Sequence, residues 1–420
     1  MDVINPATGK KYATLSAGDK DDVQLAVNAA LHARDNWALT PLARRQAILE
    51  RIAELILERK EEFAQAETKD TGKPITQARE LDIPRAAANF SFFAAASSQW
   101  SSESHPMPGQ GINYTLRQPI GIVGCISPWN LPLYLFTWKI VPAIAAGNTV
   151  VAKPSEMSPA TATLLGEVCN DAGLPPGVLN IVHGTGPDVG EVIVRHEEIK
   201  AISFTGSTAI GKRIAGICAE QLKKVSLELG GKNPVIIFED CDYEKMLSTT
   251  IKSSFSNTGQ ICLCGSRILV ERTIYERFVD DFVGRTYALK IGDPEDAATD
   301  VGALISDAHM QKVMSYISLA RQEGGHIRIG GERVKLGGDL EEGFFLEPTI
   351  ITGLDQQCRT NNEEIFGPVV TIIPFDSEEE AIDMANGTTY GLASVIWTEQ
   401  LSRAHRVAGA MQSGIVWINC

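Results

Sequence analysis

The sequence predicts an α/β protein built on a doubly wound, mainly parallel sheet. Short apolar runs separated by Gly and Pro begin near residue 120, and they show no alternation of polar and apolar residues. Helical stretches at 158–172 and 187–196 lie between these runs. Apolar strands that are each followed by a helix indicate parallel strands covered on both faces, with ligands at their carboxyl ends. The expected strands are 120–126, 148–154, 178–184, 201–207 and 233–240.

A second series of strands and helices predicts a second α/β domain that begins near residue 231. Residues 21–70 predict two further helices, the second of which opens at Thr40-Pro41, because a capping residue followed by proline is typical of a helix start. The stretch GINYTLRQP, 111–119, is expected to form an edge strand or a hairpin arm. In the second series we expect strands at 266–272, 302–306, 369–375 and 413–419 and helices at 274–287 and 307–323.

Composition and charge exclude several classes of protein. The net charge of −14, without a basic block, argues against nucleic acid or an anionic membrane as the main partner. Eight scattered cysteines are too sparse for a disulfide framework. The most apolar stretch, 119–152, is interrupted by prolines and by Lys139, so no membrane helix is expected there, and no secretory signal opens the chain. These features predict a reducing, cytoplasmic setting.

Two glycine-containing turns are candidate phosphate sites. GTGPDVG (184–190) and TGSTAIG (205–211) both lie where an expected strand passes into an expected helix, and backbone N–H groups there favour a phosphate. Each stretch alone is equally consistent with a plain turn. Lys153 and Glu156 in VAKPSE follow another strand, where a lysine and a glutamate can bond ribose hydroxyls; a solvated ion pair is the alternative.

The pair Cys262 and Cys264 raises the question of a metal clip, a redox pair or one nucleophile. A metal site would need further ligands, and a dithiol usually needs the spacing C-x-x-C, so both readings are poor. A nucleophile needs a base and an oxyanion site. Glu228, at the end of an apolar strand, is a candidate base, although a structural ion pair is the alternative. Asn130, between two prolines, is a candidate amide donor.

Six motifs occur in one order along nearly the whole chain: PWNLP, KPSE, FTGSTAIG, LELGGKNP, FSNTGQIC and EEIFGPV. Together they resemble the aldehyde dehydrogenase superfamily, as does the separation of Glu228 and Cys262. The resemblance implies that Cys262 attacks the aldehyde to give a thiohemiacetal and then a thioester. It further implies that Asn130 and the backbone N–H of Cys262 hold the oxyanion, and that Glu228 activates the hydrolytic water. Cys264 becomes a bystander.

The resemblance also implies NAD as the cofactor and no metal. Glu156 fits NAD better than NADP, since a glutamate repels a 2′-phosphate. The presence of Glu228 favours release of a free acid over transfer to coenzyme A, because members that use coenzyme A tend to lack this base. The implied cofactor-binding residues are Ser127, Pro128, Trp129, Lys153, Glu156, Gly186, Gly190, Phe204, Gly206, Ser207, Leu229, Glu364 and Phe366.

The substrate is expected to be a semialdehyde that carries a carboxylate. ELDIPRAAANFSFFAAA (80–96), NLPLYLFTWKI and GQICLCGSR resemble the branch that acts on 2-aminomuconate and 2-hydroxymuconate semialdehydes. In that branch a residue matching Arg85 is implied to bind the carboxylate; an ion pair with Glu80 or Asp82 is the alternative. Four further candidate substrate-binding residues share one helix face after Asn130: Leu131, Tyr134, Leu135 and Trp138. This face resembles the wall of the family's substrate tunnel, and plain core packing is the alternative. A broad aliphatic or aromatic aldehyde oxidase is the second hypothesis.

The resemblance implies an NAD-binding domain over 1–102 and 120–230, an oligomerisation hairpin arm over 103–119 and a catalytic domain over 231–420. Family members continue beyond VWINC with a Pro-Phe-Gly-Gly-type stretch and a strand that pairs with a neighbour, so the end of the catalytic domain is expected to be missing after Cys420. The full-length form is expected to be a homodimer or homotetramer. A truncated product that binds NAD without turnover, and a cysteine hydrolase without cofactor, remain alternatives.

Overall fold

The computed structural model describes all 420 residues, which divide into two compact units with a sheet each. The chain passes from unit 1 to unit 2 for the last time between Glu228 and Leu229. Unit 1 comprises Met1–Val3, Lys11–Asp70 and Thr76–Glu228; unit 2 comprises Ile4–Lys10, Thr71–Ile75 and Leu229–Cys420.

Unit 1 is built on a five-stranded parallel sheet with the order β7-β6-β5-β8-β9. The chain starts at the central strand β5, moves outward through β6 to β7, and returns to β8 on the other side of β5. Because the direction of winding reverses between β5 and β8, their carboxyl ends form a topological switch point, where such sheets bind ligands. The strands are β5 (Ile122–Ile126), β6 (Thr149–Lys153), β7 (Leu179–Ile181), β8 (Ile199–Thr205) and β9 (Lys224–Glu228).

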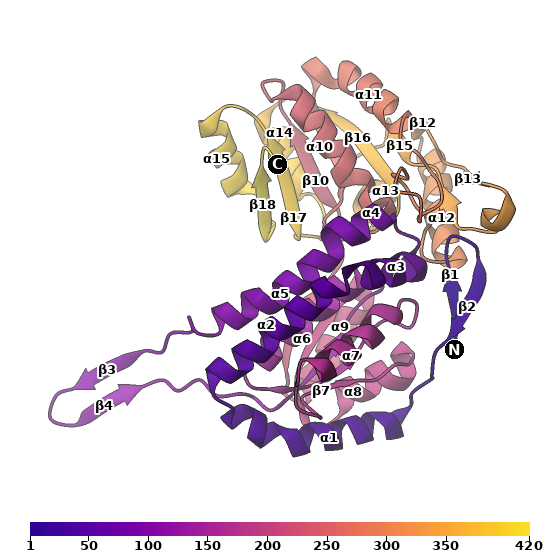
Figure 1. Cartoon of the computed structure of the whole chain (residues 1–420). Coiled ribbons are helices and arrows are strands. Elements are labelled where there is room, and N and C mark those ends of the chain that lie inside the picture. The colour runs from indigo at the N-terminus through magenta and orange to yellow at the C-terminus, as the bar shows by residue number, and fades with distance from the viewer. The chain divides into compact units, whose positions relative to one another are not determined.

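Helices cover both faces of this sheet, which confirms the doubly wound fold (Figure 1). One face carries α1, α8 and α9, and the other carries α6 and α7, on which α2 and α5 pack. Residues 21–70 form three helices rather than the two expected, because the chain breaks at Arg59, and Thr40 ends α1 instead of capping α2. The helices are α1 (Lys20–Leu39), α2 (Leu42–Glu58), α3 (Lys60–Thr71), α4 (Ile75–Gln77), α5 (Ile83–Ala96), α6 (Pro132–Ala145), α7 (Ala160–Asp171), α8 (Glu191–Arg195) and α9 (Thr208–Glu220), with π-turns η1 (Ala78–Asp82) and η2 (Gly186–Gly190).

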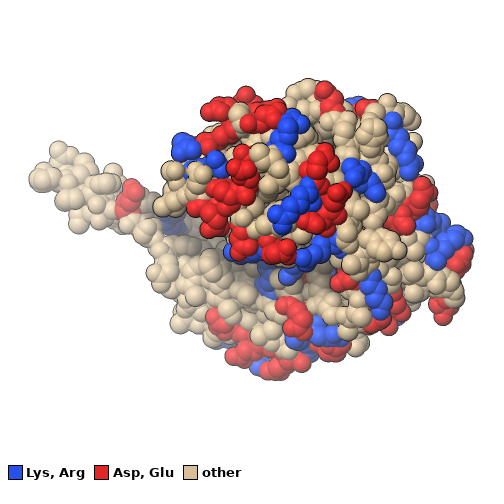
Figure 2. Space-filling model, turned by 90° about the horizontal axis from the view of Figure 1, so that it is seen from above, with Lys and Arg blue, Asp and Glu red and all other residues tan.

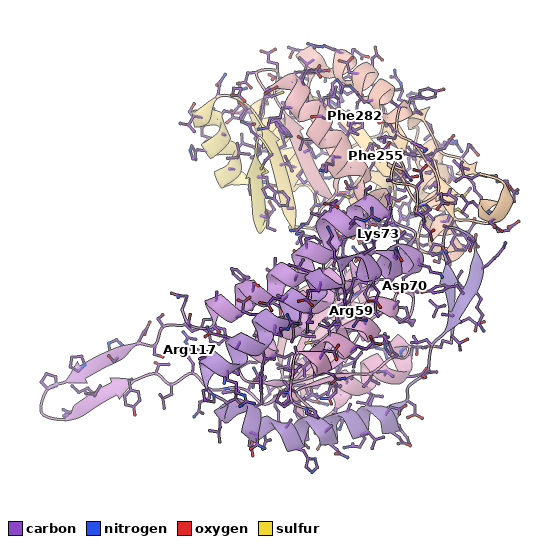
Figure 3. All side chains as sticks on the ribbon, viewed as in Figure 1. Arg59, Asp70, Lys73, Arg117, Phe255 and Phe282 are labelled. Atoms are coloured by element: carbon purple, nitrogen blue, oxygen red, sulfur yellow. The ribbon has the colours of Figure 1, made fainter.

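A two-stranded hairpin projects from unit 1, as the expected hairpin arm requires (Figure 1). Its strands are β3 (Ser104–Met107) and β4 (Gly111–Tyr114), and every residue in them is exposed. At the base of the hairpin, Arg117 donates a hydrogen bond from Nε to the carbonyl of Ser101 at 2.8 Å (Figure 3). The large apolar side chains exposed here are Met107, Ile112, Tyr114 and Leu116.

Unit 2 contains a seven-stranded sheet with the order β12-β15-β16-β11-β10-β17-β18. All neighbours are parallel except the edge pair β12–β15. The strands are β10 (Asn233–Ile237), β11 (Gly265–Glu271), β12 (His326–Ile329), β15 (Thr349–Thr352), β16 (Val369–Phe375), β17 (Ala393–Trp397) and β18 (Ile415–Ile418); small strands are β1 (Asp2–Asn5), β2 (Lys10–Thr14), β13 (Arg333–Val334) and β14 (Phe345–Leu346).

The inner strands of this sheet, such as β10 and β17, are buried on both faces, which explains their mainly apolar sequences. Along β10, Val235 and Ile237 face the cluster that contains Phe255 and Phe282, whereas Ile236 faces α14 and α15 (Figure 3). The rings of Phe255 and Phe282 lie 6.1 Å apart. The helices are α10 (Tyr243–Phe255), α11 (Arg272–Tyr287), α12 (Asp307–Gln322), α13 (Arg359–Asn362), α14 (Glu378–Asn386) and α15 (Leu401–Ala410), with 3₁₀ turns η3 (Ser256–Gly259) and η4 (Gly338–Leu340).

The expected strand at 302–306 is wrong. Three successive amides of this segment donate to three different parts of unit 2, so no neighbouring strand can form a ladder with it. Ala303 N–H bonds Gly72 O at 2.9 Å, Leu304 N–H bonds Phe344 O at 2.9 Å, and Ile305 N–H bonds the Gln260 side chain at 3.0 Å. The apolar run 302–306 is instead a buried loop that bonds Gln260 and leads into α12.

Acidic and basic side chains are interspersed over the face seen in Figure 2, and the hairpin is mostly uncharged. No helix combines the length and the apolar composition needed to cross a bilayer. On this face the acidic side chains are not gathered into one block.

Candidate active site

The switch point of unit 1 brings together two of the predicted segments. Residues Ser127–Asn130 follow β5, and Gly206–Ser207 follow β8, the neighbouring strand. The Ser127 N–H donates to Lys153 O at 3.1 Å, which ties the first segment to the end of β6. Asn130 is buried, while Pro128 and Trp129 are half-buried.

Local sequence explains the turn after β8. A Cβ on Gly206 would lie 2.5 Å from the Phe204 ring, so no larger residue fits there without a shift. Ser207 is the N-cap of α9, and its hydroxyl accepts from Ile210 N–H at 3.4 Å. This geometry exposes the first N–H groups of a 13-residue helix at the end of the sheet, where an anionic group is stabilised.

Lys153 and Glu156 form an ion pair at the end of β6, with Nζ 2.9 Å from Oε2. Lys153 Nζ also donates to Pro154 O at 3.0 Å, so the buried amine is held in one position. A cavity of about 190 Å³ lies beside it, and its lining includes apolar side chains of β8 and α9. Lys153, Gly186, Gly190 and Phe204, four of the predicted cofactor residues, line this cavity.

Two buried hydroxyls at the switch point have no hydrogen-bond partner within the protein. They belong to Ser127, directly after β5, and to Thr205, the last residue of β8. A buried hydroxyl without a partner is costly, so such groups in a native structure call for a ligand or an ordered water. The position fits a dinucleotide whose phosphates and ribose hydroxyls bond the strand ends, and the residues present therefore fit NAD.

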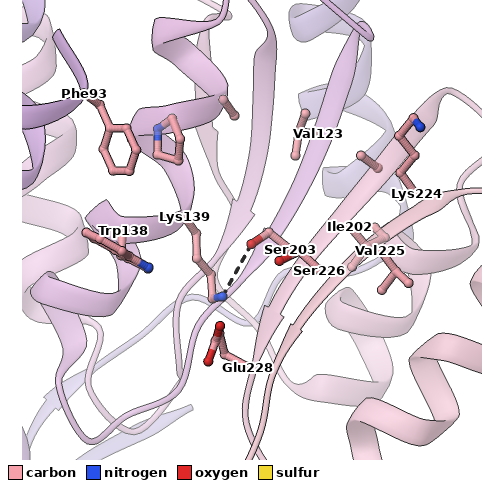
Figure 4. Close-up of a pocket in the computed structure, with 13 residues that line it drawn as sticks. Phe93, Val123, Trp138, Lys139, Ile202, Ser203, Lys224, Val225, Ser226 and Glu228 are labelled. Carbon is pink, nitrogen blue, oxygen red and sulfur yellow. Dashed lines mark hydrogen bonds between the residues drawn. The ribbon is translucent and has the colours of Figure 1, made fainter. Parts of the chain in front are cut away.

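Glu228 ends β9 with an exposed side chain, and its neighbourhood holds a residue that the sequence analysis did not assign to the site. A pocket of about 410 Å³ is lined by Glu228, Lys139, Ser203 and Trp138, among others (Figure 4). Lys139 Nζ donates to Ser203 Oγ at 3.4 Å and points toward Glu228. Burial lowers the pKa of Lys139 to about 8, and the nearby Cys125 and Glu228 oppose that shift. The sequence signal for Lys139 is its position as a lone lysine within the most apolar stretch, 119–152.

Arg85, on α5, places its guanidinium over the Tyr134 ring of α6, 4.6 Å from the centroid. Arg85 is exposed and forms no ion pair with a protein carboxylate, so the alternative pairing with Glu80 or Asp82 is not what the structure contains. Asn89 fixes the two helices to each other by donating to Tyr134 O at 3.2 Å and to Thr137 Oγ1 at 2.9 Å.

The apolar stripe beside Asn130 occupies the start of α6. Leu131 is buried, Tyr134 and Leu135 are half-buried, and Trp138 is exposed. Tyr134 and Trp138 have ring centroids 6.3 Å apart. One face of the helix thus changes from buried to open along its length, as a tunnel wall or the rim of a core would.

In unit 2, the candidate nucleophile lies just before β11, in a loop held through its backbone. Asn233 Nδ2 donates to Cys262 O at 2.7 Å and to Cys264 O at 3.0 Å, while its Oδ1 accepts from Ala393 N–H at 3.1 Å. Cys262 is half-buried, whereas Cys264 is buried. Burial raises the pKa of the Cys264 thiol to about 12. Burial and the raised pKa both disfavour the Cys264 thiolate at neutral pH.

The backbone before Cys262 is strained. Asn257 and Thr258 have φ of 50° and 56°, a left-handed conformation that is costly for residues other than glycine. Gly259 follows with φ of 69°, and a Cβ there would lie 2.1 Å from Gly367 O. Such strain is typical of functional loops and persists only where the surroundings hold it.

Glu364 and Phe366 lie in the segment that precedes β16. Glu364 Oε1 accepts from Gly231 N–H at 2.9 Å, and a Cβ on Gly230 would lie 2.3 Å from Glu364 Oε2. Gly230 thus lets the backbone approach this carboxylate, and burial raises the Glu364 pKa above its usual range. Phe366 has φ of 64°. Leu229 begins the last segment of unit 2. No group of three or more His, Cys, Asp or Glu could hold a metal ion.

The family model described as "Aldehyde dehydrogenase family" matches residues 1–420. The 2-aminomuconic semialdehyde dehydrogenase of Homo sapiens is 48% identical over 423 residues, which cover 100% of this chain and 87% of the relative. The 2-hydroxymuconic semialdehyde dehydrogenase of Pseudomonas sp. (strain CF600) is 46% identical over 422 residues, covering 99% and 87%.

Solved structures agree with these matches. A crystal structure of a putative aldehyde dehydrogenase from Burkholderia cenocepacia has a TM-score of 0.98 at 41% identity, covering 100% of this chain and 86% of that one. A crystal structure of PnpE in complex with nicotinamide adenine dinucleotide also has a TM-score of 0.98, at 40% identity and with coverage of 100% and 86%.

The chain belongs to the aldehyde dehydrogenase family and is an oxidoreductase that acts on aldehydes. The predicted α/β fold and the predicted resemblance to the semialdehyde branch are confirmed.

Proposed function

We propose that this protein oxidises a carboxylate-bearing semialdehyde, such as 2-aminomuconic or 2-hydroxymuconic semialdehyde, to the carboxylic acid with NAD. The relatives named for these substrates support the proposal. The observation that carries it in this chain is Arg85, an exposed guanidinium stacked on Tyr134 and paired with no carboxylate. Its free donors can form the bidentate pair that a substrate carboxylate accepts.

Residues of unit 1 are proposed to bind NAD. Lys153 and Glu156 would bond the adenine-side ribose, and the cavity beside Lys153 would receive apolar contacts of the cofactor. The Gly206–Ser207 turn would hold the pyrophosphate at the N-terminus of α9. Glu156 disfavours a 2′-phosphate by charge repulsion. When bound, NAD supplies an acceptor for the hydride that leaves the substrate.

Cys262 is the proposed nucleophile. Its thiolate attacks the aldehyde carbon, and the Asn130 side-chain amide and the Cys262 backbone N–H donate to the resulting oxyanion. Collapse of the thiohemiacetal expels hydride and leaves a thioester on Cys262. Glu228 then takes a proton from water as the water attacks that thioester, which releases the acid and restores the thiol. One aldehyde, one NAD⁺ and one water thus give one acid, one NADH and one proton.

The stripe of α6 supports a second candidate function. Leu131, Leu135 and Trp138 offer an apolar wall that would also receive aliphatic or aromatic aldehydes, so a broad-specificity aldehyde dehydrogenase is the alternative. The two candidates differ in whether Arg85 contributes to binding.

The deciding experiment measures NADH formation with NAD and 2-hydroxymuconic semialdehyde, with hexanal and benzaldehyde as competitors. Arg85→Ala is expected to raise KM for the semialdehyde roughly 10- to 100-fold, the effect of losing a charge-assisted pair. KM for hexanal should stay unchanged. Arg44→Ala, which removes another exposed arginine of unit 1, is the matched control. Preference for hexanal or benzaldehyde, with no effect of Arg85→Ala, would replace the semialdehyde proposal with the broad oxidase.

We further propose a homodimer or homotetramer in a reducing, cytoplasmic setting. The hairpin arm supports self-association, because Ile112, Tyr114 and Leu116 are 70%, 60% and 68% exposed on it. The reducing setting is supported by the need for a free Cys262 thiolate. Light scattering of the wild type and of Ile112→Lys tests the assembly, and an unchanged mass for the variant would remove the arm from the interface.

A further inference from the structure

One face of helix α12 holds the segment Glu363–Phe366. His309, Lys312 and Tyr316 recur along α12 at the spacing of residues that share a helix face. His309 Nε2 bonds Phe366 O at 2.7 Å, Lys312 Nζ donates to Glu364 O at 3.4 Å, and Tyr316 Oη donates to Glu363 Oε2 at 2.6 Å. The helix therefore contacts both backbone and side chains of this segment.

The segment needs such support because Phe366 has φ of 64°. A bulky residue in the left-handed region persists only when its neighbours fix it. Burial lowers the pKa of His309 to about 4, so the ring is neutral near pH 7. A carbonyl can only accept, and hence the single N–H of the neutral ring is on Nε2 and donates to Phe366 O.

The segment just before α12 is bonded to the nucleophile loop, the residues that precede Cys262. Gln260, two residues before Cys262, accepts from Ile305 N–H through Oε1 at 3.0 Å. Ser306, the next residue, caps α12 by accepting from His309 N–H at 3.2 Å. Thr258 Oγ1 donates to Gly302 O at 3.3 Å. The segment that leads into α12 thus bonds the nucleophile loop at Gly302 and Ile305, and α12 carries His309 in its first turn.

We propose that His309 is a positioning residue that fixes Phe366 and Glu364 relative to the nucleophile loop and so sets the affinity for the nicotinamide side of NAD. This inference rests on the proposed function and on the cofactor role that the resemblance to the family implies for Glu364 and Phe366. His309 acts through the carbonyl of Phe366 and does not itself touch the reacting atoms.

The test compares His309→Leu with His309→Gln. Leucine fills space without donating, whereas the glutamine amide can donate to the same carbonyl. His309→Leu is expected to raise the Kd for NAD about tenfold in calorimetry, the effect of one lost hydrogen bond. KM for NAD should rise likewise while KM for the aldehyde stays constant, and His309→Gln should restore most of the affinity. His405→Leu, at an exposed histidine of α15, is the matched control.

Hydrogen exchange provides a readout without cofactor. The amides of 365–369 should exchange faster in His309→Leu than in the wild type or in His405→Leu. The inference alone would be overturned if His309→Leu kept the wild-type Kd for NAD and the wild-type exchange rate. Equal losses of NAD affinity in the Leu and Gln variants would overturn it as well. A wild type that binds no NAD would instead overturn the proposed function, and this inference with it.

Discussion

The two sheets present their candidate site residues at opposite ends of their strands. In unit 1, the candidate residues follow strands: Asn130 comes after β5, Lys153 ends β6 and Glu228 ends β9. In unit 2, they precede strands: Cys262 comes before β11 and Glu364 before β16. The rule that ligands lie at the carboxyl ends of parallel strands therefore holds for unit 1 only.

The candidate residues at the carboxyl ends and those at the amino ends are held in place by different interactions. At the carboxyl ends, a helix begins directly after a strand, and its unpaired N–H groups and a capping residue such as Ser207 shape the turn. At the amino ends the loop runs into a strand and not into a helix, so side chains bond the loop backbone instead. Asn233, Gln260 and His309 do this in unit 2. The second arrangement depends on single side chains and should be more sensitive to mutation.

The largest expected effect is at Cys262, the reacting group of the amino-end set. Cys262→Ala should lower the rate of NADH formation about 10³-fold or more, because the covalent step is lost. Cys264→Ala should keep most of the activity, since that thiol is buried and has a raised pKa. Steady-state assays of both variants measure this; comparable losses in the two would show that both cysteines take part in the chemistry.

Two asparagines, one in each unit, test whether side chains that bond loop carbonyls matter more for activity in unit 2 than in unit 1. Asn233 donates to two carbonyls of the nucleophile loop in unit 2, and Asn180 donates to Val150 O and Gly177 O in unit 1. Both Leu variants should lose about 2–4 kcal/mol of unfolding free energy, because carbonyls are left without donors. Only Asn233→Leu should also lower kcat. Urea unfolding and assays of the folded proteins check this, and equal kcat in the two variants would contradict it.

The smallest expected effect concerns pH and Lys139. Its pKa is lowered from 10.5 to about 8 in the folded state by burial, so folding disfavours the charged amine. The resulting loss of stability is full below pH 8 and disappears as pH rises toward 10.5. Lys139→Met should therefore be more stable than the wild type by about 1–3 kcal/mol at pH 7, and the gap should close by pH 10.5.

Urea unfolding from pH 7 to 10.5 measures this gap. Lys224→Met, at an exposed lysine of β9, is the control for the loss of a lysine as such. A gap that is constant with pH would mean that the buried amine does not titrate in this range, and that the substitution acts through packing instead.

Much of unit 1 was predictable because its signals are local. The apolar run of β5, the glycine at 206 and the capping serine at 207 each act within a few residues, and the sequence places them correctly. The strand expected at 302–306 failed because its amides bond three distant segments, which no local pattern reveals. Likewise, the apolar periodicity that follows Pro41 predicted one helix, whereas the structure has two, α2 and α3, with a break at Arg59.

The sequence by itself determined the family, the α/β class and the identity of the residues proposed for catalysis, because motif order and apolar patterning are properties of the chain alone. Only the tertiary structure decided that Arg85 stacks on Tyr134, that Lys139 lies beside Glu228 and that His309 bonds Phe366. Each of these contacts joins elements that are separated in the chain, and its formation depends on how the sheet and helices pack within its own unit.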